Sequence, residues 1–473
     1  MWSFDLSQYD TVWKLLVQIG LLLLFLLIGN ILRRTIPFLR KAFIPSALIG
    51  GLLFFLTNIF TKNVCGFSII EARIMQIITY HTLAIGFIAM SFKIVDKGIK
   101  KRASTLKVFQ NGALTGSTYM LQAIVGIVIS LIFMWCGSDI FYFAGVLLPL
   151  GFGQGPGNAL TWDLNFTEAG LFSGNGSVGL TIASIGFIVA SIVGVIYINY
   201  YKRKKQIAAD SSHHVNTLSD YESKDEVEIE DSESIDKSSI QIALIFLAYA
   251  SAFGIMFLFS KISDWTGIKL FNDVAWGFNF IWGVIAATII KKIMRKVQKT
   301  KIGHRRYINN YQMDRISGFS FDVMIIAGVA AIDIDVVSQY ALFIVIICIV
   351  GAIITFLNVK FICRLCFKEN EHEIFLVNFG TLTGTASNGM ILLREVDPSY
   401  MTPTSDIFII SQFPAMLFVA PLLLMLSIGK NSLTGCLIAL GIFIVLYIGY
   451  LIFLKISSHK ADKKPTLEER KEV

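Results

Sequence analysis

Two glycine-rich stretches carry the residues of this chain that are best suited to bind a ligand. The first reads Gly151-Phe-Gly-Gln-Gly-Pro-Gly-Asn158, and the second reads Gly380-Thr-Leu-Thr-Gly-Thr-Ala-Ser-Asn388. They interrupt two apolar segments, Phe141–Phe166 and Phe375–Val396. Unsatisfied backbone is costly in hydrocarbon, so such a break persists at membrane depth only where it is buried in protein or lines a wet cavity. Two breaks at corresponding places in two halves predict the binding site of a secondary transporter.

The first break offers groups that suit an anion. Gly155 and Gly157 leave backbone N–H groups accessible, and Gln154 and Asn158 add side-chain amides. A helix that begins near Asn158 would add the partial positive charge of its N-terminus, which favours a carboxylate.

The second break offers oxygen atoms. Its substrate-binding candidates are Thr383, Thr385, Ser387 and Asn388. Backbone carbonyl groups freed at such a break suit Na⁺. The candidate ion ligands are Asp322, Thr383 and Asn378.

Ionisable residues in membrane segments are functional candidates. Arg394, at the exit of the second segment, could pair with a substrate carboxylate or form an interfacial ion pair with Glu395 or Asp397. His81 is expected to be a satisfied histidine rather than a proton relay, and Lys93 to reach the cytoplasmic face.

The alternative to a site is that the glycines only allow close helix packing. Two matching clusters, each with several polar residues, favour the site. No nucleophile elbow, HExxH motif or P-loop occurs, so the sequence supports neither an enzyme nor an ATP-driven pump. Cys363 and Cys366 are expected to be core residues at a helix end rather than a metal or redox pair, so no cofactor is predicted beyond Na⁺ as coupling ion.

The composition defines the class. Of 473 residues, 55% are hydrophobic and 16% are charged, whereas soluble proteins carry about 25% charged residues. Several windows of roughly 20 residues lack charge, which is the length of a membrane-spanning helix. The chain is predicted to be an all-α polytopic membrane protein. Its basic residues stand beside membrane segments, so the net charge of +8 does not indicate nucleic-acid binding.

The apolar runs predict five spanning helices before the polar stretch at 201–239, five after it, and one more at the end. The first five are Val12–Leu32, Ile44–Phe60, Ala72–Phe92, Asn111–Trp135 and Ser177–Tyr200. The second five are Ile240–Phe259, Val274–Ile290, Ile316–Ile332, Gln339–Ile362 and Asp406–Ile428, and the extra helix is Ser432–Leu454.

Charge asymmetry gives the predicted topology. If each glycine-broken segment is a re-entrant hairpin, the basic clusters after the first and third helices and at the end of the first half all fall on one face. The positive-inside rule makes that face cytoplasmic, with the N-terminus outside and the C-terminus inside. An odd number of spans per half then gives two inverted-topology repeats of five transmembrane helices, each with a re-entrant hairpin.

The predicted organisation has five parts. They are an N-terminal repeat (1–200, with its hairpin at 141–166), an acidic cytoplasmic linker (201–239), a C-terminal repeat (240–430, with its hairpin at 375–396), an extra C-terminal transmembrane helix (431–455) and a cytoplasmic tail (456–473).

The motifs resemble those of the bacterial sodium/glutamate symporter family. Phe152-Gly-Gln-Gly-Pro-Gly157 resembles its Gly-Gly-His-Gly-Thr-Gly run, and Ile44–Gly51 resembles its proline-then-double-glycine second helix. The resemblance covers about Val12 to Ile428. Gln154 replaces the family's His, Pro156 replaces its Thr, and the polar residues of the second hairpin are rearranged.

The resemblance implies a homodimer in the cell membrane and Na⁺-coupled uptake of L-glutamate or a similar anionic amino acid by an elevator-like movement. The departures leave room for a distant branch with another substrate. A dicarboxylate or hydroxycarboxylate symporter driven by Na⁺ or H⁺ is the close alternative, and a passive ion channel is a further one. No acidic residue lies inside either hairpin tip to recognise an α-amino group.

Overall fold

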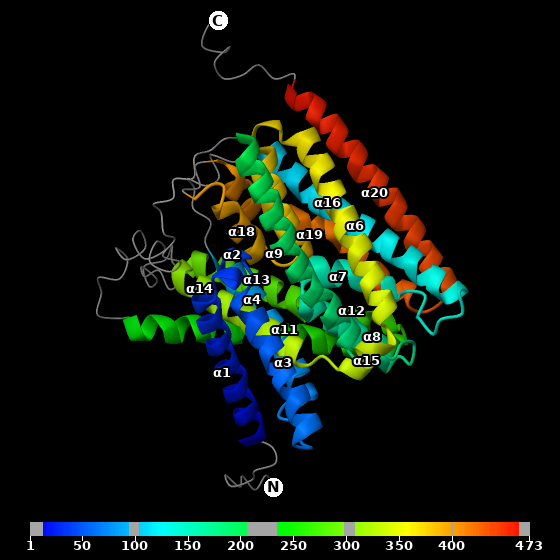
Figure 1. Ribbon diagram of the computed structural model, residues 1–473. Coiled ribbons are helices and arrows are strands. Elements are labelled where there is room, and N and C mark those ends of the chain that lie inside the picture. Colours follow the sequence, from blue (N-terminus) through cyan, green and yellow to red (C-terminus); the bar gives the residue numbers. More distant parts are fainter. Residues whose placement is uncertain (1–12, 94–103, 206–233, 298–307, 399–401, 463–473) are drawn as a thin grey trace, which may run out of the picture. The chain divides into compact units, whose positions relative to one another are not determined.

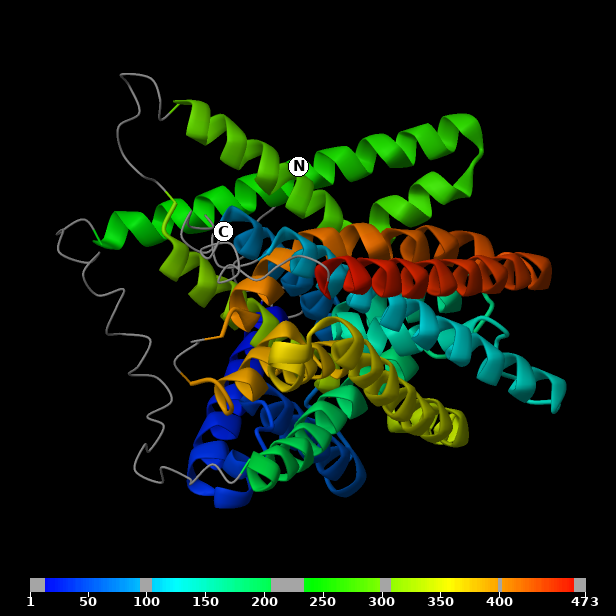
Figure 2. The same cartoon turned by 90° about the horizontal axis from the view of Figure 1, so that it is seen from above.

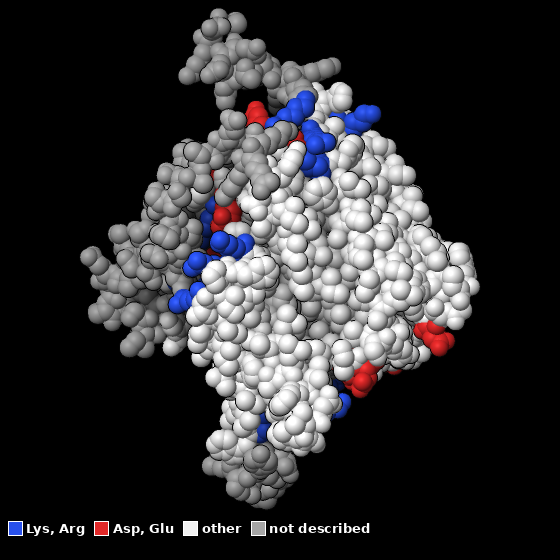
Figure 3. All heavy atoms as spheres, viewed as in Figure 1, with Lys and Arg blue, Asp and Glu red and all other residues white. Residues whose placement is uncertain are grey.

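The computed structural model describes residues 13–93, 104–205, 234–297, 308–398 and 402–462, and all regular secondary structure in these ranges is helical (Figure 1). Nine of the described helices are long and apolar enough to cross a membrane. On the face drawn in Figure 3, charged side chains occupy only a few places and most of the described surface carries none. The prediction of an all-α polytopic membrane protein is confirmed.

The chain forms two compact units that interleave along the sequence. The larger unit contains residues 1–80, 96–198 and 323–473, and the smaller unit contains 81–95 and 199–322. Three helices contribute to both units: α4 (Ala72–Phe92), α9 (Ser177–Lys205) and α14 (Asn310–Ala330). Each unit therefore combines segments from both halves of the sequence.

The remaining elements of the larger unit follow in chain order. They are α1 (Lys14–Thr35), α2 (Pro37–Lys41), α3 (Ser46–Val64), α6 (Thr105–Trp135), η2 (Ala144–Val146), α7 (Leu147–Gln154), α8 (Pro156–Glu168), α15 (Ile334–Gln339), α16 (Ala341–Cys366), η4 (Lys368–Asn370), α17 (Glu371–Thr383), α18 (Ala386–Arg394), α19 (Thr404–Gly429) and α20 (Leu433–Asp462). Helix α6 packs against α16, α19 and α20, and α6 and α20 lie side by side in Figures 1 and 2.

Small residues let α6 approach α19 closely. A methyl group on Gly112 would lie 3.0 Å from the Ala415 backbone nitrogen, and one on Gly116 would lie 2.5 Å from Cβ of Phe418. Glycines four residues apart form one smooth strip on a helix, which is a common contact surface between membrane helices. The pair explains why α6 can sit so close to its neighbours.

Buried polar side chains on α6 add hydrogen bonds to this packing. Gln110 Nε2 donates to Ser457 Oγ on α20 (3.0 Å), and Asn111 Nδ2 donates to Ser411 Oγ on α19 (2.7 Å). Asn358 Nδ2 of α16 donates to Thr118 Oγ1 (3.0 Å). Because buried polar groups are costly unless they are paired, these bonds fix how α6 is rotated against three helices.

The smaller unit contains α11 (Ser234–Thr266), α12 (Lys269–Gly277) and α13 (Asn279–Val297). Its core includes Ile88, Phe92, Ala248 and Met313. His81 Nδ1 shares a hydrogen bond of 2.6 Å with the Tyr249 hydroxyl, as expected for a satisfied histidine.

The predicted helix Val274–Ile290 is not a single helix, although the two helices found there are together apolar enough to form one span. The structure has two helices there, bent by 71° at Phe278, whose φ and ψ of −129° and 43° leave the helical region. Helix α12 carries Lys269, Asn272 and Asp273 within nine residues, so it is more polar than a spanning segment.

The other predicted helices are found with modest changes of boundary. The predicted span Ile316–Ile332 corresponds to α14, which is helical but carries Asp314, Arg315 and Asp322 and is not among the nine apolar helices. Helix α9 continues to Lys205 and α11 begins at Ser234. Most of the predicted acidic linker and the end of the predicted tail lie outside the described residues.

Candidate functional site

The first glycine-rich stretch breaks the chain between α7 and α8. Gly155 has φ of +79°, a conformation that glycine adopts without the steric cost of a side chain. Pro156 follows at the first position of α8, where its missing N–H is no loss. The rings of Phe141 and Phe166 lie 5.3 Å apart, so the start and the end of this segment are neighbours.

The second stretch breaks the chain between α17 and α18. Gly384 has φ of −140° and ψ of −106°, and Thr385 is extended before α18 begins. The two helices pack directly on each other, because a methyl group on Gly389 of α18 would clash with the Val377 carbonyl oxygen of α17. The chain thus turns back on itself at Gly384.

The two breaks lie next to each other. A methyl group on Gly155 would lie 3.8 Å from Thr385 Cγ2 and 3.8 Å from Met324 Cε. Gly186 of α9 contacts both segments, since a methyl group there would clash with the Thr383 carbonyl oxygen and lie 3.0 Å from the Phe152 ring. Segments more than 200 residues apart in the sequence therefore meet at their interrupted backbone.

Several buried amide atoms at this meeting point have no hydrogen-bond partner among the described residues. They are Gln154 Oε1, both Asn158 Oδ1 and Nδ2, and Asn388 Nδ2. The Asn158 side chain is 1% exposed. Buried polar atoms are usually paired, so a cluster of unpaired ones at two adjacent backbone breaks indicates a place where a polar ligand completes the bonding.

Comparison with known protein families identifies the class of this protein. The sequence profile described as sodium/glutamate symporter matches residues 11–385. The chain belongs to the sodium/glutamate symporter family. Its class is therefore that of a multi-pass membrane transporter, in a family whose name gives Na⁺ as coupling ion and glutamate as substrate. A search of curated proteins gave no match.

The matched region of this symporter ends at the second break, at Thr385. Helices α18, α19 and α20 follow the match. Helix α20 is nevertheless bonded to the rest of the larger unit, since the Tyr447 hydroxyl donates to Asn358 Oδ1 (3.0 Å) and that of Tyr450 to the Phe418 carbonyl (2.9 Å).

The other predicted site residues of the symporter lie at different distances from the breaks. Thr383 ends α17 and its hydroxyl donates to the Phe379 carbonyl (2.7 Å), which leaves its oxygen able to accept. Ser387 is exposed in the first turn of α18, and Gly157 is buried in the first turn of α8. Arg394 ends α18, about 12 Å along the helix axis from its start.

The other two candidate ion ligands are Asn378 in the larger unit and Asp322 in the smaller unit. Asn378 Nδ2 donates to Asn111 Oδ1 and to the Ile374 carbonyl, both at 2.8 Å, so this amide links α17 to α6. Asp322 is exposed and is the last residue of the smaller unit.

Asp163 of α8 holds the symporter's α9. Its side chain is fully buried, and Oδ2 accepts a hydrogen bond from the Gly179 backbone nitrogen (2.8 Å) in the first turn of α9. A carboxylate at a helix N-terminus satisfies free N–H groups and the helix dipole. The contact fixes α9, which reaches both breaks through Gly186.

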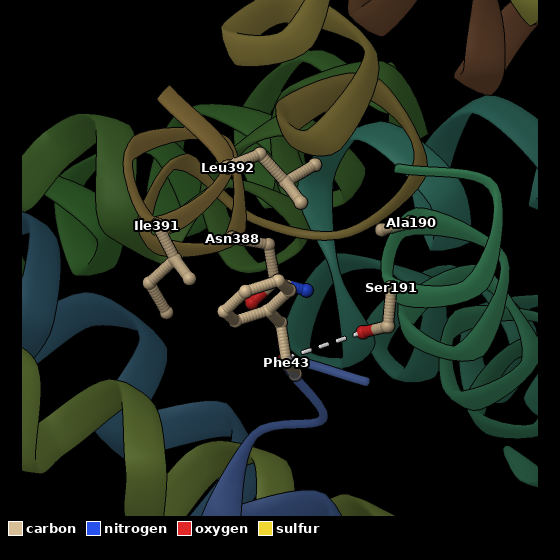
Figure 4. Close-up of a pocket in the computed structure, with 6 residues that line it drawn as sticks. All are labelled: Phe43, Ala190, Ser191, Asn388, Ile391 and Leu392. Carbon is tan, nitrogen blue, oxygen red and sulfur yellow. Dashed lines mark hydrogen bonds between the residues drawn. The ribbon is translucent and has the colours of Figure 1, made fainter. Parts of the chain in front are cut away.

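A small pocket lies beside the second break (Figure 4). It is lined by Phe43, Ala190, Ser191, Asn388, Ile391 and Leu392. Phe43 has φ of +55°, which is unusual for a bulky residue, and its carbonyl accepts a hydrogen bond from Ser191 Oγ (3.4 Å). In Figure 4 the Asn388 amide extends toward the Phe43 ring.

Polar groups hold the base of each broken segment. At the first, Lys430 Nζ donates to Asn165 Oδ1 (2.7 Å) and the Tyr142 hydroxyl donates to the Lys430 carbonyl (2.8 Å). At the second, Lys360 Nζ pairs with Glu371 Oε1 at 2.5 Å. Although burial alone raises the pKa of Glu371, its bonds to Lys360 and Arg364 lower that pKa below the usual value.

Sequence reasoning missed two residues of α6 at this site. The Tyr119 ring lies against Gly153, and Gln122 Nε2 donates to the Leu382 carbonyl (3.1 Å) and to Thr355 Oγ1 (2.8 Å). The available signal was the spacing of polar residues in an apolar helix, since Asn111, Thr115, Thr118 and Gln122 recur at intervals of four and three residues and so share one face.

Proposed function

We propose that this symporter imports L-glutamate or a similar anionic amino acid together with Na⁺, and that it binds the substrate where the two breaks meet. The observation that carries the proposal is Asn158, whose amide is buried and has no hydrogen-bond partner among the described residues although it adjoins interrupted backbone. An amide so placed is desolvated without compensation until a ligand supplies its bonds.

The substrate carboxylates are bound at the first break. The N-terminus of α8 begins directly after Gly155, and its free N–H groups and partial positive charge favour an anion. Asn158 Nδ2 donates a further hydrogen bond. Asn388 Nδ2 on α18 is a second unpaired donor, so donors approach the substrate from both segments.

Na⁺ is bound by oxygen atoms of the second break. The Thr383 hydroxyl oxygen and the carbonyl groups around Gly384 supply uncharged ligands of the kind that sodium-coupled transporters use at interrupted helices. Each net positive charge that enters down a membrane potential of 100 mV contributes about 2.3 kcal/mol. An excess of Na⁺ over substrate charge can therefore drive accumulation.

The membrane topology, the transport movement and the oligomeric state are part of the same proposal. The broken segments are re-entrant hairpins of two inverted repeats, and hairpin-bearing parts move relative to the rest to expose the site alternately. The protein is a homodimer in the cell membrane, with its N-terminus outside and its C-terminus in the cytoplasm.

Uptake into proteoliposomes tests the function. Radiolabelled L-glutamate is supplied with an inward Na⁺ gradient, and then with choline in place of Na⁺. Concentrative uptake that requires Na⁺ is expected. Uptake that equilibrates without accumulation would indicate a channel. Uptake of malate or citrate instead of glutamate would show that the substrate is a dicarboxylate or hydroxycarboxylate.

A further inference from the structure

Two residues on one face of α6 reach both broken segments. Tyr119 and Gln122 are three residues apart, so their side chains project from the same side of the helix. A methyl group on Gly153 would lie 2.5 Å from Cζ and 2.6 Å from the hydroxyl oxygen of Tyr119, and Gln122 Nε2 donates to the Leu382 carbonyl beside the second break. Helix α6 therefore contacts both broken segments.

Both residues carry an oxygen atom with no hydrogen-bond partner among the described residues. Gln122 is fully buried and its Oε1 is unpaired. Tyr119 is 6% exposed, and its hydroxyl makes no hydrogen bond within the described part of the chain. Gln154 Oε1, in the residue after Gly153, is unpaired as well.

Neighbouring polar residues on α6 do not share this property. Thr118 Oγ1 donates to the Leu114 carbonyl (2.8 Å) and accepts from Asn358, and Ser117 Oγ donates to Leu114 (2.9 Å). Packing against Gly153 requires only a ring, which phenylalanine would supply without burying a hydroxyl. Gln110 Oε1 of α6 is also unpaired among the described residues, but Gln110 bonds Ser457 of α20 and lies about 13 Å along the helix axis from Tyr119.

Three uncharged oxygens of this kind suit a cationic group that donates several hydrogen bonds. A primary ammonium has three donors and no acceptor, and no carboxylate of a hairpin tip is available to it. The Tyr119 hydroxyl can accept from the ammonium and donate its own hydrogen to the adjacent α-carboxylate.

We propose that Tyr119 and Gln122 of α6, with Gln154, bind the α-ammonium group of the substrate. The inference rests on the proposed function and deepens it, because it makes the substrate an amino acid rather than a dicarboxylate. The same oxygens could instead ligate Na⁺, so the experiment must separate the two cations.

The test compares Tyr119→Phe with the unmodified symporter in proteoliposomes. The substitution removes one hydroxyl and keeps the ring against Gly153. Losing a hydrogen bond to a charged group is expected to raise the KM for L-glutamate about 10- to 100-fold. Tyr450→Phe is the matched control, since it removes a hydroxyl bonded to the Phe418 carbonyl away from the breaks, and its KM should stay within about twofold.

Two further readings identify the group that the hydroxyl binds. Glutarate has both carboxylates of glutamate and no ammonium, so its inhibition constant should be the same in Tyr119→Phe and the unmodified symporter. The Na⁺ concentration for half-maximal uptake should also be unchanged. An unchanged KM for glutamate, an equal weakening of glutamate and glutarate, or a shift mainly in the Na⁺ dependence would each overturn the assignment. If glutarate inhibits neither protein, the KM for glutamate and the Na⁺ dependence decide whether the hydroxyl binds the ammonium group.

The two proposals fail in different measurements. Absence of Na⁺-driven glutamate uptake by the unmodified symporter overturns the proposed function before any variant is compared, and uptake of a dicarboxylate instead overturns the ammonium site as well. If Tyr119→Phe does not insert, Gly153→Ala displaces the phenol while keeping its hydroxyl, and the same selective rise in the KM for glutamate is expected. An equal effect on glutarate would contradict the proposal.

Discussion

At the scale of single residues, two buried asparagines have different expected roles: Asn158 binds the substrate and Asn111 stabilises the fold. Neither amide atom of Asn158 has a partner among the described residues, so Asn158→Ala breaks no internal hydrogen bond there. Asn111 bonds Ser411 and Asn378. We expect Asn158→Ala to abolish uptake with an unchanged melting temperature, and Asn111→Ala to lose about 1–3 kcal/mol of stability. Uptake and thermal unfolding in detergent measure both effects, and normal transport by Asn158→Ala would remove this residue from the site.

The residues that the sequence could reveal are those whose type is unusual for their surroundings. Glycine and proline in an apolar segment mark Gly155 and Gly384 as breaks, and the structure has a break at each. The residue types of Tyr119 and Gln122 gave no such signal, because α6 contains several aromatic and amide side chains and these two fit ordinary packing. Only the spacing of the polar residues included Gln122. The role of both residues depends on which segments fold against that face, and this is fixed by contacts distant in sequence.

At the scale of elements, α9 packs closely against the second break at Gly186. A methyl group there would clash with the Thr383 carbonyl oxygen, so Gly186→Ala must displace either α9 or the end of α17. We expect a loss of uptake and a cost of about 1–3 kcal/mol in stability. Gly441→Ala in α20 is the control, since a methyl group there meets nothing within 4 Å. Equal behaviour of the two variants in uptake and thermal unfolding would argue against tight packing at Thr383.

The base of the second broken segment should respond to acid. Glu371 has a lowered pKa in the folded protein, so its contribution to stability is complete above its unfolded value of about 4.5 and is lost as the pH falls through the folded pKa. Glu371→Gln should lower the melting temperature at pH 7. It should also make the fall of the melting temperature between pH 5 and 3 smaller than in the unmodified symporter. Glu369→Gln, at an exposed neighbour with no ion pair among the described residues, should keep the full decline in the same thermal scans.

Helices were predictable where apolar length alone defines them, as for α4, whose observed bounds equal the predicted ones. The bend at Phe278 was not predictable, because no proline marks it and the polar residues of α12 precede the break. The prediction extended an apolar run through a place where the backbone turns.

At the scale of the whole molecule, the membrane orientation can be read from two cysteines. Cys65 and Cys136 are exposed at the ends of α3 and α6, and the other four are buried. Helices α4 and α6 separate them in the sequence, so two crossings place both on one side, and the positive-inside rule makes that side external. We expect a membrane-impermeant maleimide to label intact cells, and labelling to disappear when both cysteines are replaced by serine.

Each single replacement, Cys65→Ser or Cys136→Ser, should keep part of the label, because each leaves one external thiol. Labelling that appears only after the cells are permeabilised would reverse the proposed orientation. Labelling of one thiol from outside and of the other only after permeabilisation would mean an odd number of crossings between them. The inverted-repeat topology would then fail as a whole, because the side on which the first broken segment opens depends on the same two crossings.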